Sequence, residues 1–132
     1  MNPAYPAVAR RAEHRCEYCH APEAVFNFPL EVEHILPPNQ GGTDDLANLA
    51  LACRACNLFK SDKQTAIDPV TGQQARLFNP REGDWLEHFR AMETGEIIGL
   101  TGVGRATVEL LKLNAPHQRA ARRMWWRLAL FP

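Results

Sequence analysis

The sequence predicts an α+β fold, and three observations support this class. The four cysteines form two Cys-x-x-Cys pairs, Cys16/Cys19 and Cys53/Cys56. Runs rich in β-branched and aromatic residues at 25–28 and 30–35 predict two short strands, separated by Pro29. A helix is expected at about 54–63, directly after the second cysteine pair. Short strands followed by a helix, rather than a regular strand–helix alternation, indicate α+β.

The cysteine spacing predicts a metal site. Residues 1–15 contain no apolar segment like that of a signal peptide, and no apolar run approaches the ~18 residues of a membrane span. We therefore expect a cytoplasmic protein that does not contact a membrane. In a reducing compartment, two such pairs with no cysteine left over are typical of a tetrathiolate zinc site, which has no open coordination position and is structural. The alternative is four unrelated buried cysteines, although random placement rarely gives this spacing.

The chain divides into three segments. Residues 1–15 are expected to form an N-terminal helix, since Pro6 suits a first helical turn. Residues 16–68 contain every chemically suggestive motif and are expected to form the core. Residues 69–132 are a C-terminal extension, which we expect to pack on that core.

Within the extension, residues 85–92 and 96–100 predict a hairpin. A helix is expected at about 104–113 with Thr101 as its cap. The sequence at 100–111 also resembles the turn of a helix-hairpin-helix, a DNA-binding element that requires a preceding helix. The residues before it favour a strand instead.

The last helix is expected at about 117–130, with Ala121, Trp125 and Leu128 on one face. The pair Trp125-Trp126 has two interpretations. The rings could stack on nucleic-acid bases, but tryptophans at helical spacing more often belong to a core.

Charge is unevenly distributed. The chain has 15 basic and 15 acidic residues, so strong non-specific DNA binding is not expected from the total. Residues 1–63 carry two more acidic than basic residues, whereas residues 116–132 carry four arginines and no acid. Any affinity for nucleic acid must therefore come from local placement of charge.

The most informative stretch is residues 32–60. It contains Glu-His-Ile-Leu-Pro at 33–37, then Gly-Gly-Thr at 41–43, Asn-Leu at 48–49, and Cys-x-x-Cys-Asn-x-x-Lys at 53–60. A histidine at a strand end beside a Pro-Pro and Gly-Gly loop is a common place for catalytic residues. Alone, such a histidine would more often be structural.

These motifs and their spacing resemble the HNH endonucleases, in the branch with two Cys-x-x-Cys knuckles and a C-terminal extension. The resemblance implies a ββα-metal (His-Me finger) fold with structural zinc knuckles, so that residues 16–68 would be the nuclease core.

The resemblance also implies roles for individual residues. His34 matches the general base that activates a water, and Asn48 matches the residue that holds the loop. Glu33, where the family often has Asp, and Asn57 match the ligands of one catalytic divalent cation, Mg²⁺ or Mn²⁺. Lys60 would neutralise charge on the phosphate, or else be a solvated helix residue.

One difficulty concerns strand geometry. Side chains alternate along a strand, so Glu33 and His34 should point to opposite faces. The expected active centre must then wrap around the end of this strand.

The predicted function is a metal-dependent endonuclease that hydrolyses phosphodiester bonds, with double-stranded DNA favoured as the substrate. A homodimer would allow double-strand cutting, and a larger protein partner would supply the DNA affinity that the balanced charge does not. The alternative is a non-catalytic zinc module that binds nucleic acid or protein. A zinc hydrolase is disfavoured, because neither cysteine pair has a neighbouring histidine that would leave an open site.

Overall fold

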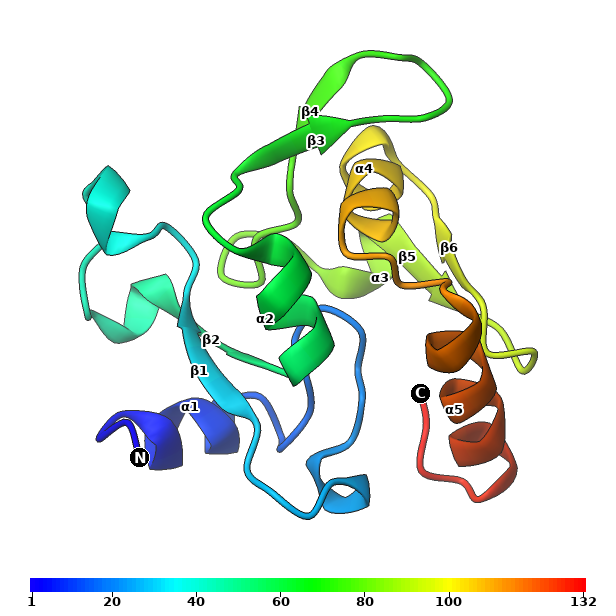
Figure 1. Cartoon of the computed structure of the whole chain (residues 1–132), viewed down its shortest axis with the longest axis horizontal. Coiled ribbons are helices and arrows are strands. Elements are labelled where there is room, and N and C mark those ends of the chain that lie inside the picture. Colours follow the sequence, from blue (N-terminus) through cyan, green and yellow to red (C-terminus); the bar gives the residue numbers. More distant parts are fainter.

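The computed structural model describes residues 1–132 and confirms the α+β class, with five α-helices and three separate two-stranded antiparallel sheets (Figure 1). No helix has both the length and the apolar character needed to cross a bilayer. The helices and strands, in chain order, are α1 (Tyr5–Arg11), β1 (Glu31–His34), β2 (Leu49–Ala52), α2 (Arg54–Lys60), β3 (Thr65–Ile67), β4 (Gln74–Arg76), α3 (Trp85–His88), β5 (Phe89–Ala91), β6 (Ile97–Gly99), α4 (Gly102–Leu110) and α5 (Pro116–Arg127).

The β1–β2 hairpin and helix α2 form the centre of the first half of the chain. β1 pairs with β2 so that Glu31 lies opposite Ala52 and His34 lies opposite Leu49. All four residues of β2 are buried, since α1 packs against this strand and both of its faces are covered. Helix α2 follows directly and packs against β1. This order of two strands and a helix is consistent with a ββα-metal core.

Two strand predictions need correction. Residues 25–28 form no strand; a 3-10 turn covers Glu23–Val25, and Phe28 is 79% exposed. The partner of β1 is instead Leu49–Ala52, which the sequence analysis did not identify. Its Leu-Ala-Leu-Ala sequence is buried on both faces and therefore lacks the polar alternation of a half-buried strand.

Other boundaries are close to expectation. The N-terminal helix is present with its proline in the first turn. Helix α2 ends three residues early, because Ser61 has a positive φ of 49° that cannot continue the helix. The β3–β4 hairpin was not predicted. The predicted hairpin at 85–100 is present only in part, because its first four residues form helix α3.

Helix α4 joins the elements of the extension. The predicted cap is present: the Thr101 Oγ1 accepts a hydrogen bond from the Gly104 amide at 3.0 Å. Strand β6 precedes this helix, so the extension has no helix-hairpin-helix there. At the other side, Arg105 binds both carboxylate oxygens of Asp68, at 2.9 and 2.8 Å, and so fixes the β3–β4 hairpin to α4. The guanidinium holds the pKa of Asp68 well below its ordinary value.

Trp85, in α3, contacts residues beside the first cysteine pair. Its indole Nε1 donates to the backbone oxygen of Tyr18 at 2.9 Å, and its ring stacks on His20 with 3.9 Å between centroids. Both partners lie beside the first cysteine pair. The two halves of the chain therefore share one apolar cluster of 20 buried residues.

Helix α5 is anchored by an arginine rather than by the predicted apolar face. Arg122 is 1% exposed, whereas Leu128 is 62% exposed. The guanidinium donates to the Gly95 oxygen at 2.6 Å, to the Asn114 Oδ1 at 3.3 Å, and to the Leu113 oxygen. Trp125 packs against the core, as the core interpretation predicted.

We expect Arg122→Met to lower the free energy of unfolding by about 2–4 kcal/mol, because it leaves buried carbonyl groups without a donor. Urea denaturation would measure this. Arg123→Met on the exposed side of the same helix is the matched control, and equal midpoints for the two variants would contradict the assigned role of Arg122.

Candidate functional site

The four cysteines meet in the interior. Cys16, Cys19, Cys53 and Cys56 are all buried, and their Sγ atoms lie within 4.8 Å of one another. The Sγ atoms of Cys19 and Cys53 are 3.7 Å apart. Tetrahedral zinc with Zn–S bonds of 2.3 Å requires a sulfur–sulfur separation of about 3.8 Å. The cluster therefore fits a structural zinc ion and is the one cluster of three or more such ligand side chains in the chain.

Backbone contacts bring the two cysteine pairs together. The first pair is attached to β2 through Glu17, whose amide donates to the Leu51 oxygen and whose carboxylate accepts from the Leu51 amide, each at 2.9 Å. The second pair starts α2, where the Cys53 Sγ caps the helix by accepting from the Cys56 amide at 3.5 Å. Zinc bound here would fix the N-terminus of α2 against the β1–β2 hairpin.

His34 is the last residue of β1, and its side chain reaches solvent. The imidazole is 27% exposed, and its Nε2 lies 2.7 Å from Oδ1 of Asp44. Asp44 lies in the loop between β1 and β2 and is 95% exposed. An ion pair or hydrogen bond this exposed contributes little stability, so it orients the ring rather than holding the fold.

Asn48 closes the loop that follows His34. Its Nδ2 donates to the backbone oxygens of Leu36 and Thr43, at 3.0 and 2.8 Å, and its Oδ1 accepts from the Leu36 amide at 2.9 Å. Gly42 lies against the same contacts, and a Cβ there would be 1.7 Å from the Leu36 oxygen. The loop of residues 36–48 is therefore tied down at its base by the side chain of Asn48.

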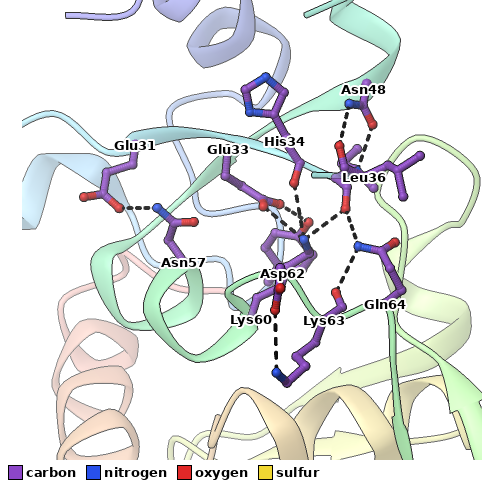
Figure 2. Close-up of polar contacts among 12 residues, drawn as sticks. Glu31, Glu33, His34, Leu36, Asn48, Asn57, Lys60, Asp62, Lys63 and Gln64 are labelled. Atoms are coloured by element: carbon purple, nitrogen blue, oxygen red, sulfur yellow. Dashed lines mark hydrogen bonds and ion pairs between the residues drawn. The ribbon is translucent and has the colours of Figure 1, made fainter. Parts of the chain in front are cut away.

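Glu33 and Lys60 form a buried pair between β1 and α2 (Figure 2). Their side chains are 5% and 3% exposed, with 3.1 Å between Oε2 and Nζ. Tyr18 donates its hydroxyl to the other oxygen of Glu33. Lys60 also donates to the backbone oxygens of His34 and Ile35, at 3.3 and 3.0 Å. Burial raises the pKa of Glu33 above its ordinary value, and the Lys60 ammonium and the Tyr18 hydroxyl oppose that shift.

These contacts do not match the roles implied by the resemblance. Glu33 has both oxygens engaged and no open side toward a cation. Lys60 is neither a solvated helix residue nor free to contact a phosphate. The physical reason is that β1 turns the Glu33 face toward α2, and a buried carboxylate requires a buried cation as partner.

Asn57 follows the last cysteine and lies on the same side of β1 as Glu33. Its Nδ2 donates to Oε2 of Glu31 at 2.6 Å, while Arg54 contacts the other oxygen at 3.2 Å. The Oδ1 of Asn57 accepts no hydrogen bond. Figure 2 shows the His34 ring on the side of the strand away from Asn57 and Lys60. Strand alternation thus persists through His34, whose ring lies apart from the Asn57 and Lys60 side chains.

Three polar partners were missed from the sequence. Glu31 lies two residues before Glu33, so the period of two in a strand could have placed it on the same face. Tyr18 lies between two cysteines, and that position gives no sign of its bond to Glu33. Asp44 is one of two adjacent acids in a loop, and spacing does not tell which of them reaches His34.

Residues 16–63 match the family model of the HNH endonucleases. The chain carries an HNH endonuclease domain. Searches of curated proteins and of solved structures found no match to this chain. The matched region holds all four cysteines and the β1, β2 and α2 elements, whereas the whole of the extension lies outside it.

Zinc removal tests the cysteine cluster. We expect one zinc ion per chain by atomic absorption, and we expect a strong chelator to abolish the cooperative thermal transition, because metal binding and folding are coupled in small domains. Cys53→Ser should show the same loss without chelator. Protein that contains no zinc and keeps its transition in chelator would contradict the assignment.

A double-mutant cycle tests the buried pair. Lys60→Met should lower the free energy of unfolding by about 3–5 kcal/mol, because it leaves the Glu33 carboxylate buried without its cation. Glu33→Gln combined with Lys60→Met should recover part of that loss in urea denaturation. Additive losses in the double variant would show that the two side chains are not coupled.

Proposed function

We propose that this protein is a metal-dependent endonuclease that hydrolyses phosphodiester bonds in double-stranded DNA, with His34 as the general base. The observation that carries the proposal is the position of His34 inside an HNH domain: at the end of a strand, partly exposed, on a loop tied down by Asn48. A general base must be held in position and still reach solvent and substrate.

The contact with Asp44 suggests how the imidazole would work. A carboxylate at Nε2 favours the tautomer that carries its proton there, which leaves the Nδ1 lone pair free to accept a proton. Nδ1 would take a proton as water attacks phosphorus, and the P–O bond to the leaving oxygen would break. The leaving oxygen would take its proton from solvent. Asn48 would contribute by positioning the loop.

The resemblance adds one divalent cation, Mg²⁺ or Mn²⁺, to this proposal. The Oδ1 of Asn57 is an oxygen ligand suited to such an ion, and the Glu31 carboxylate lies beside it. Glu33, the other ligand implied by the resemblance, does not fit in the observed arrangement, because Lys60 and Tyr18 occupy its oxygens. The cation ligands remain predictions.

A second candidate is a non-catalytic zinc module that binds nucleic acid. One observation favours it: the Glu33 and Lys60 side chains form a buried pair instead of joining His34 at the surface. The two candidates differ in a single property, which is whether the function needs the His34 imidazole.

Nicking of supercoiled plasmid in the presence of Mg²⁺ or Mn²⁺ distinguishes them. We expect His34→Ala to lower the nicking rate by about 10²- to 10⁴-fold, the usual contribution of a general base. His14→Ala, at a histidine 60% exposed outside this loop, is the matched control and should nick like the wild type. Nicking that persists in the His34 variant would exclude the assigned base. A zinc-loaded wild type that binds DNA without nicking it would favour the binding module.

A further inference from the structure

Helix α5 carries three unpaired arginines along one side. Arg119, Arg123 and Arg127 are exposed and follow each other at intervals of four residues, so each is displaced by ~6 Å along the helix from the one before. No acidic residue occurs between 110 and 132. The arginines that form ion pairs in this chain all lie elsewhere: Arg54, Arg81 and Arg105. We call Arg119, Arg123 and Arg127 the α5 arginine stripe.

The stripe borders a hollow between α5 and the β5–β6 turn. The hollow has a volume of about 470 Å³ and is lined by Thr94, Glu96, Pro116, Arg119, Ala120 and Arg123. Its lining thus includes two arginines of the stripe, a threonine and Pro116 at the start of α5. The N-terminus of a helix carries partial positive charge and favours anions.

The walls of this hollow are held in place by backbone contacts. Gly95, at the turn, has φ of 87°, and a Cβ there would lie 2.1 Å from the Arg119 oxygen. The buried Arg122 guanidinium donates to the Gly95 oxygen at 2.6 Å. The β5–β6 turn therefore meets α5 at a fixed distance, and the hollow is part of the folded structure.

The first half of the chain has the opposite charge to this surface. Residues 1–63, which include the whole matched HNH domain, carry more acidic than basic residues, and zinc with four thiolates would add further negative charge. A polyanionic substrate is therefore repelled by the catalytic half. Guanidinium groups bind phosphate well because their planar N–H donors match its oxygens.

We propose that the α5 arginine stripe and its hollow bind the phosphodiester backbone of double-stranded DNA and hold it for the HNH domain. This proposal rests on the proposed function for its substrate. The contact is independent of base sequence, since phosphates carry none of that information. Glu96 is the one acid in the hollow and weakens the binding of an anion there.

The composition of α5 favours DNA over an anionic membrane. Membrane-surface helices bury a broad apolar face among the lipids. On α5 the strongly exposed apolar side chain is Met124, with Leu128 at the helix end, while both tryptophans are at least half-buried. That apolar area is too small to hold a helix in a bilayer surface.

Fluorescence anisotropy with a short labelled duplex tests the stripe, on protein that also carries His34→Ala so that DNA stays intact. The variant with Arg119→Gln, Arg123→Gln and Arg127→Gln should lower the slope of log K against log salt concentration by up to about 3, since each phosphate contact contributes ~0.9. The matched control removes three other exposed, unpaired arginines by the changes Arg10→Gln, Arg76→Gln and Arg90→Gln. It has the same net charge and should keep most of the slope.

Glu96→Gln should tighten duplex binding several-fold by removing the one acid of the hollow. Unchanged or weaker binding by this variant would contradict the binding of a DNA phosphate in the hollow. Equal slopes for the two triple variants would contradict the contact between the stripe and DNA. Protein that sediments with vesicles of anionic lipid but does not bind the duplex would also contradict the proposal.

The failure of this proposal is distinguishable from that of the proposed function. If wild-type protein nicks plasmid while both triple variants bind alike, the stripe assignment alone is wrong. If the stripe variant loses duplex binding while the wild type does not nick, the stripe is supported and the endonuclease proposal fails.

Discussion

The cysteine cluster is the constraint on which the rest of this fold depends. Four buried thiols converge from two segments that are more than 30 residues apart, one before β1 and one at the start of α2. A zinc ion bound to all four thiolates would join these two segments through four bonds. The three sheets have only two strands each, and such hairpins are marginal alone. The metal therefore supplies a connection that the small sheets do not.

The position of the cysteine cluster also explains the buried polar contacts between β1 and α2. Because α2 is held against β1, the strand residues that face the helix are enclosed, and Glu33 forms an ion pair with Lys60 and accepts a hydrogen bond from Tyr18. Lys60 in turn binds the backbone oxygens at the end of β1, directly at His34. The same pairing turns the imidazole outward, toward Asp44 and solvent. A buried ion pair thus fixes the backbone of the residue that we propose as the base.

The parts predicted correctly from the sequence are those in which local chemistry determines structure. Paired cysteines specify a metal, and Thr101 specifies the start of a helix. The failures are tertiary: β2 was missed because burial on both faces removes its alternation. Glu33 and Lys60 were assigned to a cation and a phosphate because a motif identifies residues without showing which face is covered. The inward turn of Arg122 depends on a carbonyl of the β5–β6 turn, which spacing along α5 does not reveal.

We propose that zinc bound to the four cysteines holds the HNH domain in the form that cuts DNA. The most direct measurement is the initial rate of plasmid nicking in excess Mg²⁺, determined on samples with graded amounts of zinc bound per chain. The account predicts a rate that rises in proportion to the zinc bound and vanishes in the zinc-free chain, because the loop of His34 and helix α2 then lose their common anchor. Full nicking by zinc-free protein would contradict it.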